Sequence, residues 1–187
     1  MLRDEAGAQL RQYLLRFPAE STRLVDVRQQ LQDDDGDVFS RANARGHITT
    51  SAIVLDTRGT QVLLIHHRTL DRWLQPGGHY EAPGSLWESA LREVAEETGV
   101  AGLRPHPAWT GLPLDIDSHP IPANPRKQEP AHWHHDYAYL AVADAEAPLQ
   151  AQQAEVHAAA WLPLERLRES PSARLRTVAA KLAALGC

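Results

Sequence analysis

The stretch PGGHYEAPGSLWESALREVAEETGV, at residues 76–100, most constrains how this chain of 187 residues can fold. Ser85, with Glu88 three residues later, forms a capping-box pattern, which marks the start of a helix. Gly99 supplies the left-handed residue that commonly ends one. The sequence therefore predicts a short, doubly capped helix over residues 85–98, directly after a glycine-rich turn.

This predicted helix has one apolar and one acidic face. At 100° per residue, Glu93, Glu96 and Glu97 share one arc, while the packing arc holds Trp87, Leu91 and Val94. A solvated acidic strip is the simplest interpretation, but like charges three and four residues apart destabilise a helix, and so do anions near its C-terminus. Arg92 offsets part of this repulsion. Three carboxylates on one face are also what a hard cation such as Mg²⁺ requires, and the Gly78 carbonyl is placed to join them.

The rest of the chain predicts a mixed β-sheet covered by helices, an α/β (α+β) fold. Segments rich in β-branched and apolar residues predict strands at 48–55, 62–67, 136–143 and 157–164. Apolar residues at helical spacing predict helices within 3–33, divided at Pro18, and over 171–185. The proline-rich stretch 105–130 predicts loop or short edge strand.

Length and composition indicate one domain of residues 46–187 with an N-terminal helical extension of residues 1–45. The single cysteine, Cys187, excludes an intrachain disulfide, and the formal charge of -5 argues against a broad nucleic-acid surface. The sequence has no apolar run long enough to span a membrane and no secretory leader pattern, so a cytoplasmic protein without membrane contact is expected. We expect a small-molecule partner, and packing of the extension in a homodimer is an open alternative.

The segment from Gly78 to Val100 resembles the Nudix box of the Nudix hydrolase family. The box reads Gly, five residues, Glu, seven residues, then Arg-Glu-apolar-x-Glu-Glu-x-Gly-apolar. Eight of its nine specified places are matched here, by Gly78, Arg92, Glu93, Val94, Glu96, Glu97, Gly99 and Val100. The departure is Gly84, which stands where the family has its first glutamate. The resemblance covers about residues 46–168, including VLLIHHR, WLQPGG, Glu155 and the turn Trp161-Leu162-Pro163-Leu164, and it implies a Nudix-like α/β/α sandwich.

The resemblance implies a divalent-metal-dependent pyrophosphohydrolase that cleaves a diphosphate linkage in a nucleoside-diphosphate-type compound, with Mg²⁺ or Mn²⁺ as cofactor. Glu93 and Glu97 are the first expected ligands, followed by Glu96 and the Gly78 carbonyl. Glu96 or Glu97 could instead position or deprotonate the attacking water. The alternative is a catalytically reduced ligand-sensing or protein-binding module, to which the loss of the glutamate at Gly84 would point.

Isomerase and RNA-decapping activities are disfavoured. The isomerase related to isopentenyl diphosphate isomerase needs an active-site cysteine, and Cys187 stands at the chain end. The acidic charge balance disfavours RNA as substrate.

Two arginines have different expected roles. Arg92 is expected to support the site by pairing with box carboxylates, while Arg68 resembles the arginine that often meets substrate phosphate in this family. With Gly84 unable to supply a carboxylate, either Glu81 or Glu88 must support Arg92, or the support is lost. Glu81 is favoured because the capping box occupies Glu88.

The histidine-rich segment HWHHD, residues 132–136, has three interpretations. On a strand, His132 and His134 point to one side and Tyr137 to the other. Metal binding, the lining of a substrate pocket, and an ordinary strand with solvated imidazoles all fit this pattern. The pocket interpretation makes His132, His134 and Tyr137 substrate-binding candidates.

Overall fold

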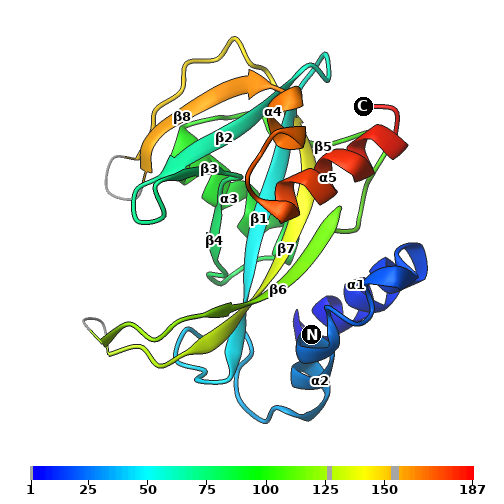
Figure 1. The fold of residues 1–187 in the computed structure, drawn as a ribbon, viewed down its shortest axis with the longest axis vertical. Coiled ribbons are helices and arrows are strands. Elements are labelled where there is room, and N and C mark those ends of the chain that lie inside the picture. Colours follow the sequence, from blue (N-terminus) through cyan, green and yellow to red (C-terminus); the bar gives the residue numbers. More distant parts are fainter. Residues whose placement is uncertain (1, 126–127, 153–155) are drawn as a thin grey trace.

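The computed structural model describes residues 2–125, 128–152 and 156–187 and contains a mixed eight-stranded sheet between layers of helices (Figure 1). Glu155 lies outside these residues. The strands are β1 (Gly46–Asp56), β2 (Gln61–His67), β3 (Arg72–Leu74), β4 (Gly77–His79), β5 (Arg104–Pro105), β6 (Asp115–Ile121), β7 (His132–Ala143) and β8 (Val156–Pro163). The helices are α1 (Leu2–Arg16), the 3-10 turn η1 (Pro18–Glu20), α2 (Val25–Asp33), α3 (Leu86–Thr98), α4 (Glu165–Arg168) and α5 (Ala173–Ala184).

The two longest strands, β1 and β7, form the centre of the sheet. They run parallel in continuous register from Gly46 opposite Trp133 to Asp56 opposite Ala143. The order across the sheet is β3-β2-β1-β7-β5, and the remaining strands pair with one of these: β4 with β1, β6 with β7 and β8 with β2. All the other pairs are antiparallel. The predicted mixed sheet is confirmed.

Alternation along β1 sends side chains to two different cores. Ile53 and Leu55 are fully buried in a cluster with Leu175, Val178 and Leu182 of α5. The intervening Ala52 and Val54 are buried in a cluster with Val94 of α3. Helices α3 and α5 therefore cover opposite faces of the sheet, and Figure 1 shows α5 in front of it and α3 behind. This is the α/β/α arrangement that the sequence resemblance implied.

Helix α3 begins and ends where its sequence pattern predicts. The Ser85 side chain accepts from the Glu88 amide, and the Glu88 carboxylate accepts from the Ser85 amide, so both halves of the capping box form. Gly99 takes the left-handed conformation at φ 73. The helix is thus fixed in length and direction before it contacts the sheet.

Strands β6 and β7 are more extensive than the sequence predicts. The proline-rich stretch contains β6, and β7 begins at His132 instead of residue 136. Pro120 lacks an amide hydrogen but is tolerated because β6, within the described residues, pairs with β7 alone and so has an edge facing away from the ladder. The paired β6–β7 ribbon extends away from the helices in Figure 1.

The N-terminal extension shares a core with the rest of the chain. Ala6, Leu10 and Tyr13 of α1 are buried in one cluster with Ile48 and Tyr137 of the sheet. Within the described residues, no helix has the length and apolar character needed to cross a membrane.

A buried ion-pair network joins the first and last helices across β6. Asp115, which is fully buried, lies 3.0 Å from Arg23, 2.9 Å from Arg174 and 2.7 Å from Lys181. Lys181 of α5 and Arg23 also hydrogen-bond to the hydroxyl of Tyr13 in α1. Because unpaired buried charges are costly, this network makes the extension part of the folded unit.

Candidate active site

Two glutamates of α3 are held against the glycine turn in β4. The Glu97 Oε2 accepts a hydrogen bond of 2.9 Å from the Gly77 amide. A Cβ added at Gly78 would lie 2.3 Å from Glu93 Oε2, so only glycine lets this carboxylate approach the backbone so closely. Glu93 and Glu97 are 9% and 3% exposed, whereas the Glu96 side chain is 51% exposed. The acidic face is therefore two buried carboxylates with one at the surface.

Arg92 connects this carboxylate pair to the turn that precedes α3. Its guanidinium donates to the carbonyl oxygens of Glu81 at 2.9 Å and His79 at 3.3 Å, and to Glu93 Oε1 at 2.8 Å. Its Nε lies 3.4 Å from Glu96 Oε1. Residue 81 thus meets Arg92 through its main chain, so the contact is independent of the side chain at that position.

The two alternatives for the missing family glutamate differ in the structure. The Glu88 carboxylate accepts from the amide of Ser85 at 2.7 Å and from its hydroxyl at 2.9 Å, so it belongs to the capping box. Gly84 has φ +145, a conformation that side chains rarely adopt. A glutamate could not occupy position 84 without strain in the turn.

Burial and neighbouring charge act against each other at Glu93. Burial raises the pKa of Glu93, the hydrogen bond and charge of Arg92 lower it, and the nearby charges of Glu96 and Glu81 raise it again, with a net upward shift. A bound cation would relieve the desolvation and the repulsion between the carboxylates.

The donor atoms fit a hard divalent cation. Carboxylate oxygens and a glycine backbone are the ligands that Mg²⁺ and Mn²⁺ accept, and the absence of a Cβ at Gly78 leaves the main chain open to Glu93. Among the described residues, Glu93, Glu96 and Glu97 do not bring one carboxylate oxygen each to within 4.8 Å of one another. In this conformation Arg92 holds Glu93 and the Gly77 amide holds Glu97.

The predicted substrate contacts come from two parts of the fold. Arg68 is exposed in the turn after β2, and His132 and His134 are half-buried on β7. Tyr137 must be corrected as a substrate contact: it is 0% exposed, and its hydroxyl donates to the Ala6 carbonyl of α1 at 3.2 Å. It is a core residue because the N-terminal extension covers its face of the sheet.

His47, which was not among the residues predicted from the sequence, lies beside His134 in the structure. The two residues are register partners on the parallel strands β1 and β7. Parallel pairing joins segments far apart in the sequence, and no local spacing encodes its register. The available signal is that His47 directly precedes the predicted strand 48–55. If the strand is extended by one residue, its alternation places His47 on the same face as Thr49.

Comparison with known proteins identifies the family. Residues 45–184 match the family model described as the NUDIX domain. A probable DHNTP pyrophosphohydrolase of Lactococcus lactis subsp. cremoris is 29% identical over 149 residues, which cover 80% of this chain and 81% of that protein. The chain spans less than half of two Nudix hydrolases of Arabidopsis thaliana, 44% and 40% of their lengths.

Solved structures share the fold at low sequence identity. A NUDIX-family hydrolase from Clostridium perfringens has a TM-score of 0.56 at 21% identity, covering 74% of this chain and 97% of its own. The E. coli dihydroneopterin triphosphate pyrophosphohydrolase has a TM-score of 0.55 at 16% identity, covering 73% and 94%. With the box motif on α3 and three quarters of the chain matched, the protein belongs to the Nudix family of hydrolases, which act on pyrophosphate bonds.

Proposed function

We propose that this protein is a Mg²⁺- or Mn²⁺-dependent pyrophosphohydrolase that cleaves a diphosphate linkage in a nucleoside-diphosphate-type compound. The observation that carries the proposal is the pair of buried carboxylates, Glu93 and Glu97, fixed against the Gly77–Gly78 backbone. Helical spacing places these two carboxylates on one face of α3, beside a glycine backbone, and carboxylate and carbonyl oxygens are the ligands that Mg²⁺ and Mn²⁺ prefer.

Each residue of the site has a distinct task in this proposal. Glu93 and Glu97 hold the metal with the Gly78 carbonyl, and Arg92 keeps Glu93 and the preceding turn in place. A bound divalent ion neutralises phosphate oxygens and acidifies water. Glu96, exposed at the rim, is positioned to orient the attacking water or take its proton. Arg68 offers a positive charge to a substrate phosphate.

The substrate class is narrowed by the names of similar proteins. The Lactococcus relative is named a probable DHNTP pyrophosphohydrolase, and the E. coli structure is that of a dihydroneopterin triphosphate pyrophosphohydrolase. We therefore place dihydroneopterin triphosphate first in a panel that also contains nucleoside triphosphates, dinucleoside polyphosphates and nucleotide sugars.

The test compares Glu97→Gln with Glu169→Gln, a matched change at an exposed helix-end glutamate. With Mg²⁺ and the best substrate of the panel, Glu97→Gln should lower kcat by about 100-fold or more, while Glu169→Gln leaves it unchanged. EDTA should abolish turnover of the wild type, and Mg²⁺ or Mn²⁺ should restore it. Full activity of Glu97→Gln would refute the assignment.

A ligand-sensing or protein-binding module is the second candidate, favoured by Gly84 alone. It predicts that nucleotides raise the melting temperature while no compound in the panel is hydrolysed. Turnover that is lost in Glu97→Gln excludes this alternative.

A further inference from the structure

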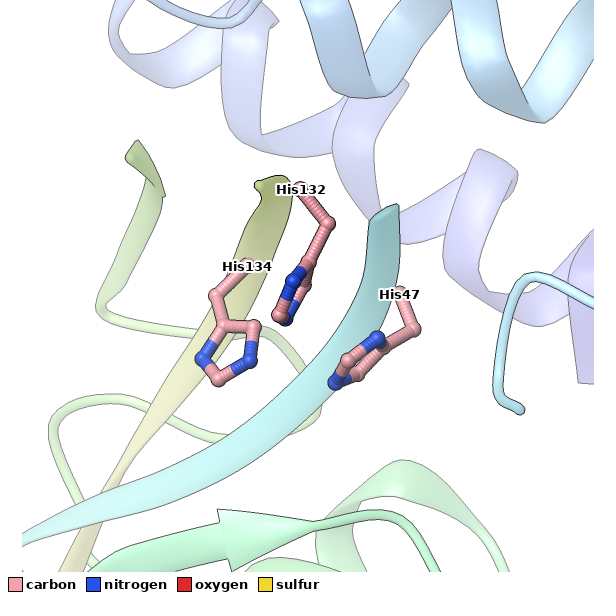
Figure 2. A group of neighbouring side chains, drawn as sticks. All are labelled: His47, His132 and His134. Carbon is pink, nitrogen blue, oxygen red and sulfur yellow. The ribbon is translucent and has the colours of Figure 1, made fainter. Parts of the chain in front are cut away.

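A cluster of histidines lies on the central strands. His47 comes from β1, and His132 and His134 come from β7 (Figure 2). Each of the three offers one ring nitrogen, and these atoms all lie within 4.8 Å of one another. The ring centroids are 4.6 Å apart for His47 and His134 and 5.1 Å apart for the other two pairs. Figure 2 shows the rings converging in the space between the two strands.

His47 is the residue that ordinary packing does not explain. It is 1% exposed, and neither of its ring nitrogens has a hydrogen-bond partner among the described residues. Leaving a buried polar group without a partner is unfavourable, so most such groups in folded proteins are satisfied by protein, water or an ion. The unpartnered nitrogens of His47 lie where two further imidazoles converge.

The protonation and orientation of the rings suit metal coordination. Burial lowers the pKa of His47 to about 4 and that of His134 to about 2, so both rings are neutral at pH 7. The His132 Nδ1 lies 2.8 Å from the Pro130 carbonyl, a contact in which Nδ1–H donates and Nε2 keeps its lone pair. Metal-binding histidines typically make this second contact through their other ring nitrogen.

We propose that His47, His132 and His134 bind a borderline divalent transition-metal ion, Zn²⁺ foremost, at a site distinct from the glutamate site. Three neutral imidazoles match Zn²⁺ and related ions and do not match Mg²⁺, which prefers oxygen. Three protein ligands leave one tetrahedral position for water or another small ligand. The ion joins β1 to β7 at the end of the sheet from which the β6–β7 ribbon extends.

The two sites face opposite sides of β1. Thr50 hydrogen-bonds to Ser89 of α3 at 2.9 Å, so the even-numbered residues of β1 face α3 and its glutamates. His47, an odd-numbered residue, points the other way, as does Ser51, which bonds to Asp136. The two proposed ligand sets therefore share no residue, and each can be changed separately. His79 lies between them, since its ring is 5.0 Å from that of His47 and its carbonyl accepts from Arg92.

The experiment titrates Co²⁺, and then Zn²⁺ in competition, into metal-stripped full-length protein without a polyhistidine tag. Visible absorption reports tetrahedral Co²⁺, and elemental analysis after dialysis reports stoichiometry. The main variant is His132→Gln, because this half-buried residue can be changed without opening the core. His47→Gln is the second variant, with its fold checked by circular dichroism. His157→Gln is the matched control, since it belongs to another histidine-containing group, with His66 and Asp71.

The wild type should bind one tetrahedral Co²⁺, seen in the visible spectrum, that Zn²⁺ displaces, whereas Co²⁺ at the oxygen ligands of the glutamate site should not give this spectrum. His132→Gln should weaken that binding at least about tenfold, the smallest loss seen when even a supporting partner of a metal ligand is removed. His157→Gln and Glu97→Gln should keep it. Absence of the tetrahedral Co²⁺ spectrum in the wild type, an unchanged spectrum in His132→Gln, or loss of the spectrum in Glu97→Gln or His157→Gln would each overturn the proposal.

Discussion

At the scale of single residues, Gly84 shows why a departure from a family pattern is not simply a lost side chain. Its φ of +145 lies where L-residues are strained, and a Cβ there would lie 3.3 Å from Glu88 Oε2. The turn has been built around glycine, and Tyr80 donates to the Gly84 carbonyl at 2.7 Å. Restoring the family's glutamate would therefore place a second carboxylate beside Glu88 in a strained backbone.

We expect Gly84→Glu to destabilise the protein by about 1 to 3 kcal/mol without raising kcat/KM. Urea unfolding and steady-state kinetics measure the two effects. Gly102→Glu is the control, because Gly102 has φ +68 and open space around it, so its loss of stability should be smaller. A Gly84→Glu protein that is both stable and more active would contradict this expectation, because it would show that the turn accepts the family's glutamate at position 84.

The glutamate site and the histidine cluster differ in how far residue spacing could predict them. Glu93, Glu97 and Gly78 lie within one short stretch, so helical periodicity and a glycine turn predict that they meet. His47 and His134 are brought together by strand pairing across the whole domain. The burial of Tyr137 likewise depends on α1, which covers it. The sequence around Tyr137 gives no indication of this contact.

At the scale of elements, two glutamates near the start of α3 have different roles: one stabilises the helix and the other affects the metal site. Glu88 stabilises the helix start, and the charge of Glu81 acts on Glu93. Arg92 is held by the carbonyl of residue 81, which persists whatever the side chain. Stability and metal affinity should therefore respond to different substitutions.

We expect Glu88→Ala to lower the free energy of unfolding, because the capping box loses the carboxylate that accepts from the Ser85 amide, with little change in Mg²⁺ activation. Glu81→Ala should leave stability unchanged and raise the Mg²⁺ concentration needed for half-maximal activity, because a negative charge near Glu93 is removed. Chemical denaturation and Mg²⁺ titrations of activity check both. The reverse pattern would assign the supporting role to the helix residue.

Helices and strands were predicted well where a strong local signal marks their ends. They were predicted less well where pairing between distant strands sets their extent. The caps of α3 predicted where that helix begins and ends, and the β-branched runs of β1 and β2 predicted the ends of these strands to within two residues. The stretch 105–130 was predicted as loop or short edge strand, and pairing with β7 decided which of its residues form the strand β6.

At the scale of the whole molecule, the charge network around Asp115 couples folding to pH. Burial raises the pKa of Asp115, but the charges of Arg174, Lys181 and Arg23 outweigh it and hold the pKa well below its usual value. A carboxyl group whose pKa is lowered by folding stabilises the native state above its unfolded pKa, near 3.8, and this contribution is lost as the pH falls towards the folded value.

The wild type should therefore lose stability progressively below about pH 4, as followed by urea midpoints between pH 7 and pH 2. Asp115→Asn should cost about 3 to 5 kcal/mol at pH 7, because buried Lys181 and the partly buried Arg23 and Arg174 lose their shared anion, and its stability should fall less steeply with acid. Asp144→Asn, a change at an exposed loop, is the control. A wild-type midpoint that does not change with acid would contradict this account, even if Asp115→Asn fails to fold.

The docking of α1 has a practical consequence for anyone who delimits this protein by its family match, which begins at residue 45. A shortened chain that starts there would expose the apolar sheet surface formed by Ile48, Tyr137 and Tyr139, which α1 covers in the intact protein. Apolar surfaces of this kind promote aggregation. Poor solubility of such a fragment would then report the loss of the covering helix, and would say nothing about the competence of the catalytic residues it retains.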